Sequence, residues 1–491
     1  MGDGTPLEEE RRAKVARLRA SGREPYPWEF PGRVGSNAVR AACSSLTAGG
    51  DPAAAVLRVA GRIRAIRQHG RTAFADLEDL EGSIQLLFRV DDLGEERYRA
   101  WLSDLDSGDI LGAEGHPTVT RKGEPTLVAD SLTLLAKAIS PPPEKFHGLT
   151  DVEERLRRRY VDLLSSPAVR ERFRVRSLLV REIRHAFDDA GFLEVETPVL
   201  LRVASGAAAA PFVTRSNYLA AELQLRISIE LPLKRLLVGG LERVYELGRS
   251  FRNEDLDTIH SPEFSELEAY WAYADYHDMR RFMEALFERL AKRTVEILPE
   301  NPEVARAAAR FRPPFATLDF VESLERASGI SDLLSKSRDE LRDLARRAGS
   351  TVPDNSSTGT FLDKLFEHYV EPTIDRVTFV VDHPAATTPL AKGHRSKPGR
   401  VERFEVFAPG YELANAYTEL TDPDEQERRF REQLGERGDD RYAFDLDYVE
   451  ALRYGLPPTT GIGFGVDRLV MALLGLPSIK DAILFPLMRA K

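Results

Sequence analysis

The chain has 491 residues, of which 42% are hydrophobic and 30% charged, and its formal net charge is -10. This length exceeds one ordinary core and predicts two or three domains of a soluble globular protein without indiscriminate affinity for nucleic acid. No apolar run approaches the ~20 residues that span a bilayer, the charged N-terminus does not resemble a secretory signal, and a single cysteine excludes an intramolecular disulfide or a cysteine-rich zinc site. We therefore expect a cytoplasmic protein without a membrane partner.

The first part of the chain reads as a small β-domain. Residues 7–22 have the spacing of a charged amphipathic helix, and a passage rich in proline and glycine follows. From about 56 to 135, five short alternating runs separated by glycines predict a small barrel, with an OB-fold as the leading candidate. One stretch carries five arginines without an acid among them, and a solvated strand edge is an alternative interpretation of it: Arg58, Arg62, Arg64, Arg67 and Arg71. Three consecutive prolines, 141–143, predict a stiff linker.

The second part, from residue 151, mixes helices and strands. Residues 168–190 have helical apolar spacing, and residues 192–197 read as a strand that Pro198 ends. Residues 300–375 are mostly helical, and we interpret them as an insertion. We expect an α+β protein with two domains: a helix and OB-fold barrel at 1–145, and an antiparallel sheet flanked by helices at 151–491.

Two stretches of the second part predict nucleotide chemistry. Residues 244–270 read as a hairpin, and a polar loop between its strands places Arg252, Glu254, His260 and Phe264 close together. A guanidinium matches phosphate bidentately, and an aromatic face stacks on a purine. Residues 461–469, GIGFGVDRL, predict a glycine-rich strand running into a helix that presents Arg468.

In this order, the two stretches resemble motifs 2 and 3 of class II aminoacyl-tRNA synthetases. The segment 168–198 resembles motif 1 of that class, which forms a dimer interface, so the resemblance implies a homodimer. It further implies that Arg252 binds the α-phosphate of ATP and the substrate carboxylate, that Arg468 binds the γ-phosphate, and that Phe264 stacks on adenine. Glu254 and His260 complete the implied ATP site.

A second cluster of acids lies further along the chain. Glu405 and Glu412 are seven residues apart across an expected turn at 409–410, so their side chains can converge. Carboxylates together with nucleotide phosphates make a Mg²⁺ site. On spacing alone, two solvated acids on strand edges are an equally good interpretation.

The amino-acid substrate is suggested by two further acids. Glu268 and Tyr270 are two apart on one expected strand, and Asn415, Tyr417 and Glu419 share a face of another. If Glu268 and Glu419 close on one pocket, they would stabilise a cation, whereas an acidic substrate would need the opposite charge.

Several segments spread along the chain, among them VAGRIRAIRQHGRTAFADLED, KFHGLTDVEERLRRRYVDLL, ERVYELGRSFRNE and PSIKDAILFP, resemble class II lysyl-tRNA synthetases, and the likeness covers nearly the whole length. The resemblance implies activation of L-lysine with ATP and Mg²⁺, followed by transfer to tRNA(Lys). It implies that Gly206 and Glu230 meet the α-amino group, and that five residues hold the side chain: Glu268, Tyr270, Asn415, Tyr417 and Glu419. On the barrel, the positions that would read the anticodon are Arg67, Phe74 and Gln85.

The chain departs from the family pattern around the amino-acid pocket. The departures fall at Ala210, where the family has arginine, and at Gln224, Pro232, Ile259, Ala414 and Ala416. The acids expected to bind the ε-ammonium group are retained. Two alternatives to a lysine–tRNA ligase therefore stay open. One is a related enzyme that activates lysine or an analogue for another acceptor, and the other is a non-catalytic tRNA-binding regulator.

Overall fold

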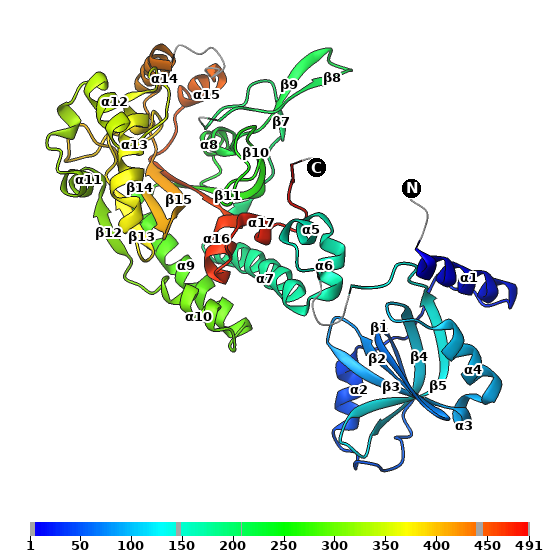
Figure 1. Cartoon of the computed structure of the whole chain (residues 1–491). Helices are drawn as coiled ribbons and strands as arrows, with labels where there is room; N and C mark the ends of the chain where they lie inside the picture. The colour runs from blue at the N-terminus through cyan, green and yellow to red at the C-terminus, as the bar shows by residue number, and fades with distance from the viewer. Residues whose placement is uncertain (1–4, 144–148, 208, 438–444, 490–491) are drawn as a thin grey trace. The chain divides into compact units, whose positions relative to one another are not determined.

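The computed structural model describes residues 5–143, 149–207, 209–437 and 445–489, and the chain divides into two compact units, Met1–Thr150 and Asp151–Lys491 (Figure 1). The domain boundary expected at residue 145 falls within 144–148, which lie outside the described residues. Among the described residues, no helix is long and apolar enough to cross a membrane.

The first unit is a closed five-stranded barrel with strand order β1-β2-β3-β5-β4, which confirms the predicted OB-fold architecture. All neighbouring strands are antiparallel except β3 and β5. The strands are β1 (Leu57–His69), β2 (Thr72–Glu78), β3 (Ser83–Arg89), β4 (Ile110–Val119) and β5 (Pro125–Ala136). The helices are α1 (Pro6–Ala20), α2 (Ser36–Cys43), α3 (Val90–Leu93) and α4 (Glu95–Asp104), of which only α1 had been expected.

Alternation along β2 and β3 decides which side chains face the barrel core. Ala73 and Ala75 of β2 and Leu86 and Phe88 of β3 are completely buried inside. The intervening residues therefore project from the outer surface, because successive side chains of a strand point to opposite faces. Phe74 is one of these outward residues and is half-buried, so it is not part of the barrel core.

The second unit is built on an eight-stranded sheet with order β12-β13-β14-β15-β16-β11-β10-β6 (Figure 1). Its pairs are antiparallel except at the two edges, where β12–β13 and β10–β6 are parallel. The largest core cluster joins one face of this sheet, including Leu267 and Ala269 of β11, to the helices α7, α9, α10 and α16. This arrangement confirms the expected antiparallel sheet flanked by helices, and it leaves the opposite face, with Glu268 and Tyr270, for a site.

The remaining elements follow in chain order. Before the central hairpin lie α5 (Val152–Arg157), α6 (Arg159–Ser165), α7 (Pro167–Asp189), β6 (Leu193–Glu194), β7 (Leu200–Leu201), β8 (Val213–Ser216), β9 (Ala221–Leu225) and α8 (Glu230–Val238). The hairpin and the helical stretch comprise β10 (Arg243–Phe251), β11 (Glu263–Ala272), α9 (Tyr276–Ile297), α10 (Pro302–Ala309), β12 (Ala316–Asp319), α11 (Phe320–Ser328), η1 (Leu333–Ser335), α12 (Arg338–Arg347), α13 (Thr358–Tyr369) and η2 (Glu371–Thr373). The last elements are β13 (Thr378–Val381), η3 (Ala385–Thr387), β14 (Arg403–Ala408), β15 (Tyr411–Thr418), α14 (Pro423–Arg437), α15 (Leu446–Leu452), β16 (Thr459–Gly465), α16 (Val466–Leu474) and α17 (Ile479–Ala482).

Two segments differ from the sequence-based expectation. The strand expected at 192–197 is only the two-residue β6, because the backbone N–H and the hydroxyl of Thr197 donate to the carboxylate of Glu246 and draw the chain out of the ladder. The stretch 300–375 is mostly helical, but it also contributes the edge strand β12 to the main sheet, and Val304 of α10 packs in the main core.

Candidate active site

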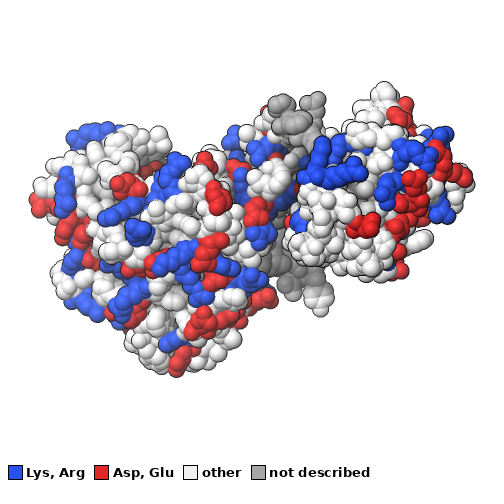
Figure 2. All heavy atoms as spheres, turned by 90° about the horizontal axis from the view of Figure 1, so that it is seen from below, with Lys and Arg blue, Asp and Glu red and all other residues white. Residues whose placement is uncertain are grey.

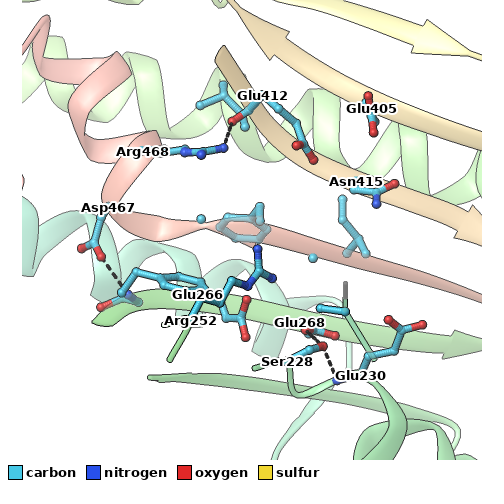
Figure 3. A pocket seen from close by; sticks show the side chains of 18 of the residues that line it. Ser228, Glu230, Arg252, Glu266, Glu268, Glu405, Glu412, Asn415, Asp467 and Arg468 are labelled. Atoms are coloured by element: carbon cyan, nitrogen blue, oxygen red, sulfur yellow. Dashed lines mark hydrogen bonds between the residues drawn. The ribbon is translucent and has the colours of Figure 1, made fainter. Parts of the chain in front are cut away.

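The hairpin of β10 and β11 forms one wall of a cavity of 480 Å³ on the open face of the main sheet. The strands β14, β15 and β16, the start of α16 and the loops before α8 contribute other parts of the wall (Figure 3). The structure thus brings together residues from widely separated parts of the sequence. The predicted site residues that line the cavity are Gly206, Glu230, Arg252, Glu254, His260, Phe264, Glu268, Tyr270, Glu405, Glu412, Asn415, Tyr417 and Arg468.

Glu268 lies at one end of the cavity in a nearly complete hydrogen-bond shell. Its Oε1 accepts hydrogen bonds from the Ser228 hydroxyl at 2.8 Å and the Ile229 backbone N–H at 3.1 Å, and its Oε2 accepts one from the Tyr270 hydroxyl at 2.8 Å. Burial, together with the nearby acids Glu266 and Glu230, raises the pKa of Glu268 to about 8. A cation bound here would favour the ionised carboxylate and lower that pKa.

Glu419 does not line the cavity, although the sequence had placed it on a shared face with Asn415 and Tyr417. It is completely buried behind Gly461, which does line the cavity, and its Oε2 lies 2.5 Å from the ammonium group of Lys234. A side chain at position 461 would overlap the Tyr270 ring and Glu419 Oε1. The missing side chain of Gly461 is therefore what gives the cavity access to this acid.

The other end of the cavity carries the two arginines. Arg252 follows β10, donates from Nε to the Ile227 carbonyl oxygen at 3.2 Å, and has its guanidinium 5.0 Å from the ring centre of Phe264. Arg468 on α16 donates to the carbonyl oxygens of Ile259 at 3.2 Å and Glu412 at 3.0 Å. Both guanidinium groups are held by main-chain oxygens without an ion pair to an acid among the described residues, so their charges remain available to an anion.

The loop residues Glu254 and His260 lie at the rim of this end. The Glu254 carboxylate accepts a hydrogen bond from the backbone N–H of Ala210 at 2.8 Å, and His260 Nδ1 lies 2.9 Å from Asp257 Oδ2. Both residues are exposed, so a ligand in the cavity can reach them.

Glu405 and Glu412 lie on the neighbouring strands β14 and β15 and both face the cavity (Figure 3). Burial raises the pKa of Glu405 to about 8, although the Arg403 guanidinium beside it has the opposite effect. No group of three or more His, Cys, Asp or Glu side chains suited to a metal ion occurs among the described residues. A metal ion here would therefore need oxygen ligands from a bound phosphate as well as from these two acids.

Sequence reasoning missed several residues that line the cavity, among them Glu266, Ser228 and Asp467. Glu266 lies between Phe264 and Glu268 on the same face of β11, so the alternation that identified those two residues could have identified it as well. Ser228 lies in a loop and carried no signal. The Asp467 carboxylate accepts hydrogen bonds from the Arg176 side chain of α7 at 2.5 Å and from the Ser265 backbone N–H at 2.7 Å, and thereby ties α7, β11 and α16 together.

Comparison with known proteins decides the family. Residues 151–489 match tRNA synthetases class II (D, K and N), and residues 57–135 match the OB-fold nucleic acid binding domain. The chain belongs to the class II tRNA synthetases. Proteins named lysine--tRNA ligase are similar over nearly the whole synthetase: that of Roseiflexus castenholzii is 43% identical over 489 residues, which cover 99% of each chain. That of Carboxydothermus hydrogenoformans is 43% identical over 484 residues and 97% of each chain, and that of Staphylococcus aureus 44% over 441 residues and 88% of each.

Most of the positions at which this synthetase departs from the family pattern make contacts that the structure shows. Ala210 holds Glu254 through its backbone, and the Gln224 side chain accepts a hydrogen bond from the Ala204 backbone N–H at 2.8 Å. The Ile259 carbonyl oxygen accepts from Arg468, while Ala414 and Ala416 pack in the main core. Nothing in the structure explains Pro232.

The outer face of the synthetase's barrel carries the three residues predicted to read an anticodon. Arg67 on β1 pairs in register with Phe74 on β2, and Asp76 on β2 pairs with Gln85 on β3. The Arg67 guanidinium donates to both carboxylate oxygens of Asp76 at 2.6 Å. The Gln85 side-chain oxygen accepts from the Thr126 hydroxyl at 3.1 Å, which leaves its amide N–H groups without a protein partner among the described residues.

The arginine-rich stretch of β1 is less basic in the fold than in the sequence. Acids from neighbouring segments pair with most of its arginines, in the pairs Arg58–Glu114, Arg64–Glu78, Arg67–Asp76 and Arg71–Asp91. Figure 2 shows basic and acidic side chains interspersed over the visible face of the molecule. An acid that is distant along the chain becomes a neighbour across the strand ladder, which the spacing within one strand cannot reveal.

Proposed function

We propose that this synthetase is a lysine–tRNA ligase that activates L-lysine with ATP and transfers it to tRNA(Lys). The observation that carries the proposal is the distribution of charge in the cavity. A buried acid, Glu268, lies at one end, and at the other lie Arg252 and Arg468, neither of which forms an ion pair within the described part of the chain. Lysine presents an ammonium group and a carboxylate at its two ends, and ATP brings phosphates to the arginine end. The names of the similar proteins support the same substrate. These substrates point to a cytoplasmic reaction.

In the first step, a carboxylate oxygen of lysine attacks the α-phosphorus of ATP, the bond to the bridging oxygen breaks, and pyrophosphate leaves. Arg252 binds the lysine carboxylate and the α-phosphate, and it stabilises the negative charge that gathers between them. Arg468 binds the γ-phosphate, Phe264 stacks on adenine, and Glu254 and His260 contact the nucleotide from the loop.

The lysine is held at the opposite end of the cavity. Gly206 and Glu230 meet its α-amino group, while Glu268, Tyr270, Asn415, Tyr417 and Glu419 enclose its side chain. Glu405 and Glu412 would hold Mg²⁺, since carboxylate oxygens are the ligands this ion prefers and the two acids lie on adjacent strands at the phosphate end. When bound, Mg²⁺ would supply positive charge to the phosphate oxygens.

In the second step, a terminal ribose hydroxyl of the tRNA attacks the lysyl carbonyl carbon and AMP leaves. The barrel contributes by recognising the anticodon. Phe74 stacks on one base, and Gln85 and Arg67 bind base edges through their N–H groups. Support comes from the outward orientation of Phe74 and the amide N–H groups of Gln85.

We also propose a C₂ homodimer, the commonest closed symmetry of oligomers. Exposed apolar side chains gather on the segments after α7: Leu193 is 52% exposed, Leu200 50% and Val213 55%. Burying them against a second copy would remove this apolar surface from water. Sedimentation at micromolar concentration tests the proposal, and a stable, fully active monomer would contradict it.

The decisive experiment is ATP–pyrophosphate exchange with each of the twenty amino acids, ornithine and β-lysine. Lysine is expected to support the fastest exchange. If an analogue replaces it, or if exchange is rapid but tRNA(Lys) is not charged, the enzyme activates its amino acid for another acceptor. Binding of tRNA without any exchange would identify a non-catalytic regulator. Faster exchange with aspartate or asparagine would contradict the assignment of the acidic end.

A further inference from the structure

A completely buried ammonium group lies next to the acidic end of the cavity. It belongs to Lys234 of α8, whose Nζ is 2.5 Å from Glu230 Oε1 and 2.5 Å from Glu419 Oε2. Three aromatic rings enclose the group, with centres at 5.7, 5.3 and 5.7 Å from Nζ: Tyr270, Tyr417 and Tyr448. A buried ion pair of this kind is costly to break, because removal of one partner leaves the other charge uncompensated.

Lys234 stands behind the two acids without lining the cavity. Glu230 lines the cavity and also accepts a hydrogen bond from the Tyr417 hydroxyl. Glu419 approaches the cavity beside Gly461, and its Oε1 has no hydrogen-bond partner among the described residues. Each acid thus faces Lys234 with one oxygen. The second oxygen of Glu230 is on a residue that lines the cavity, and that of Glu419 is buried beside Gly461.

Lys234 offsets one of the negative charges at this end of the cavity. Glu230, Glu268 and Glu419 carry three negative charges when ionised, Lys234 carries one positive charge, and Glu266 on the same face of β11 is a further acid of the cavity. A lysine molecule brings two ammonium groups, while its carboxylate faces Arg252 at the other end. Without Lys234, the three acids would exceed the charge of the substrate and repel one another.

We infer that Lys234 is a positioning residue, which fixes the Glu230 and Glu419 carboxylates at the acidic end of the cavity and favours their ionised forms when lysine binds. The inference deepens the proposed function and rests on it. Lys234 acts through its two acids and does not touch the substrate.

The acids around Lys234 make this role measurable as a pH dependence. Burial raises the pKa of Glu419 to about 8, and the Lys234 ammonium opposes that rise. Several titratable groups surround Lys234 and the two acids paired with it. They are Glu268 and Tyr270 of β11, Tyr417 of β15 and Tyr448 of α15, in addition to Glu230 of α8 and Glu419 after β15 themselves. Loss of Lys234 should raise the pKa of Glu419 further, so that a higher pH is needed to ionise this acid for lysine binding.

The test is Lys234→Met, followed by exchange kinetics between pH 6.5 and 9.5. We expect the KM for lysine at pH 7 to rise at least ~10-fold, with kcat and the KM for ATP within about 3-fold of wild type, because uniform substrate binding is lost. The midpoint of the pH profile of the lysine KM should move upward by about one unit. An unchanged lysine KM together with an unchanged midpoint would overturn the inference. So would a rise in the KM for ATP and a fall in kcat as large as the rise in the lysine KM.

Lys137 provides a matched control. Its side chain is also completely buried and lies 2.7 Å from Asp109, with Asp106 as second partner, but it belongs to the barrel. Lys137→Met should lower the melting temperature without changing the lysine KM or its midpoint. If it moves the midpoint as Lys234→Met does, the effect is general destabilisation and the inference is wrong.

If Lys234→Met does not fold, the double variant Lys234→Met, Glu230→Gln can be tested in its place. It removes one acid together with the ammonium group, so the net charge is preserved and no excess buried charge remains. Its lysine KM should stay raised because Glu230 faces the cavity, but its midpoint should return to within about half a unit of wild type. A midpoint well above wild type would overturn the inference. Absence of lysine-dependent exchange in the wild-type enzyme would instead refute the proposed function.

Discussion

The barrel face and the cavity use the same kinds of side chain in opposite settings. On the barrel, the Arg67 side chain is 42% exposed and pairs with Asp76, which is 26% exposed. In the cavity wall, Lys234 and Glu419 form a pair with both side chains at 0% exposure. An exposed pair contributes little to stability and exchanges its partner for a ligand at small cost, whereas a buried pair is fixed. The comparison teaches that exposure decides what an ion pair can do. The exposed pair on the barrel can give up its partner for a ligand, whereas the buried pair beside the cavity keeps its two charges in place.

The largest loss of activity is expected when the Arg252 guanidinium, positioned to stabilise the transition state of adenylation, is removed. Arg252→Ala should lower the adenylation rate by ~10²-fold or more, the scale seen when one preorganised donor is removed. Arg249→Ala is the matched control, since Arg249 lies on the same hairpin, is 44% exposed and is 3.7 Å from Glu263. Pre-steady-state adenylate formation measures both variants, with circular dichroism as the check on folding. Near-wild-type adenylation by Arg252→Ala would contradict the motif 2 assignment.

Glu268→Gln should weaken lysine much more than ATP. Loss of a charge-assisted hydrogen bond of ~1.5–3 kcal/mol corresponds to a rise in the lysine KM of about 10- to 150-fold. In the wild type, the lysine KM should fall as the pH rises from 7 to 9, because Glu268, with its pKa raised to about 8, must lose its proton to bind an ammonium group. The variant should show a flatter profile. Glu263→Gln, on the exposed end of the same strand, should match the wild type.

On the barrel face, Phe74→Ala should reduce tRNA charging by one or two orders of magnitude, since stacking on a base contributes ~1–3 kcal/mol. Lysine-dependent exchange without tRNA should hardly change. Phe88→Ala is the contrasting variant, because Phe88 is completely buried inside the barrel and its truncation should lower the melting temperature. Unchanged charging by Phe74→Ala would show that this face does not read the anticodon.

The smallest effect concerns the exposed ion pair. Asp76→Asn should change the free energy of unfolding by at most ~1 kcal/mol, and the change should shrink as salt is added. Asp109→Asn breaks a completely buried pair with Lys137 and should cost several times more, on the order of 3–5 kcal/mol. Urea unfolding of both variants measures the contrast. Equal losses of unfolding free energy in the two variants would show that burial does not determine how much such an ion pair contributes to stability.

The features that could be predicted from the sequence are those set by the spacing of residues within one strand. Alternation in β2 and β3 gave the barrel, and the spacing of Phe264, Glu268 and Tyr270 gave one wall of the cavity. The sequence could not predict contacts between distant segments. The hydrogen bonds from Thr197 to Glu246 shorten β6, the acids of β2 and β4 neutralise the arginines of β1, and Lys234 meets Glu419 only after the sheet has formed.

Gly461 lies where the cavity wall has no room for a side chain. A methyl group at this position would meet the Tyr270 ring and the Glu419 carboxylate. Tyr270 pairs with Gly461 across the ladder from β11, and Glu419 directly follows β15. Rotation of one side chain cannot relieve such crowding, because interiors are close-packed. Position 461 is thus closed to any side chain in this fold, because a substitution there would have to displace the Tyr270 ring or the Glu419 carboxylate.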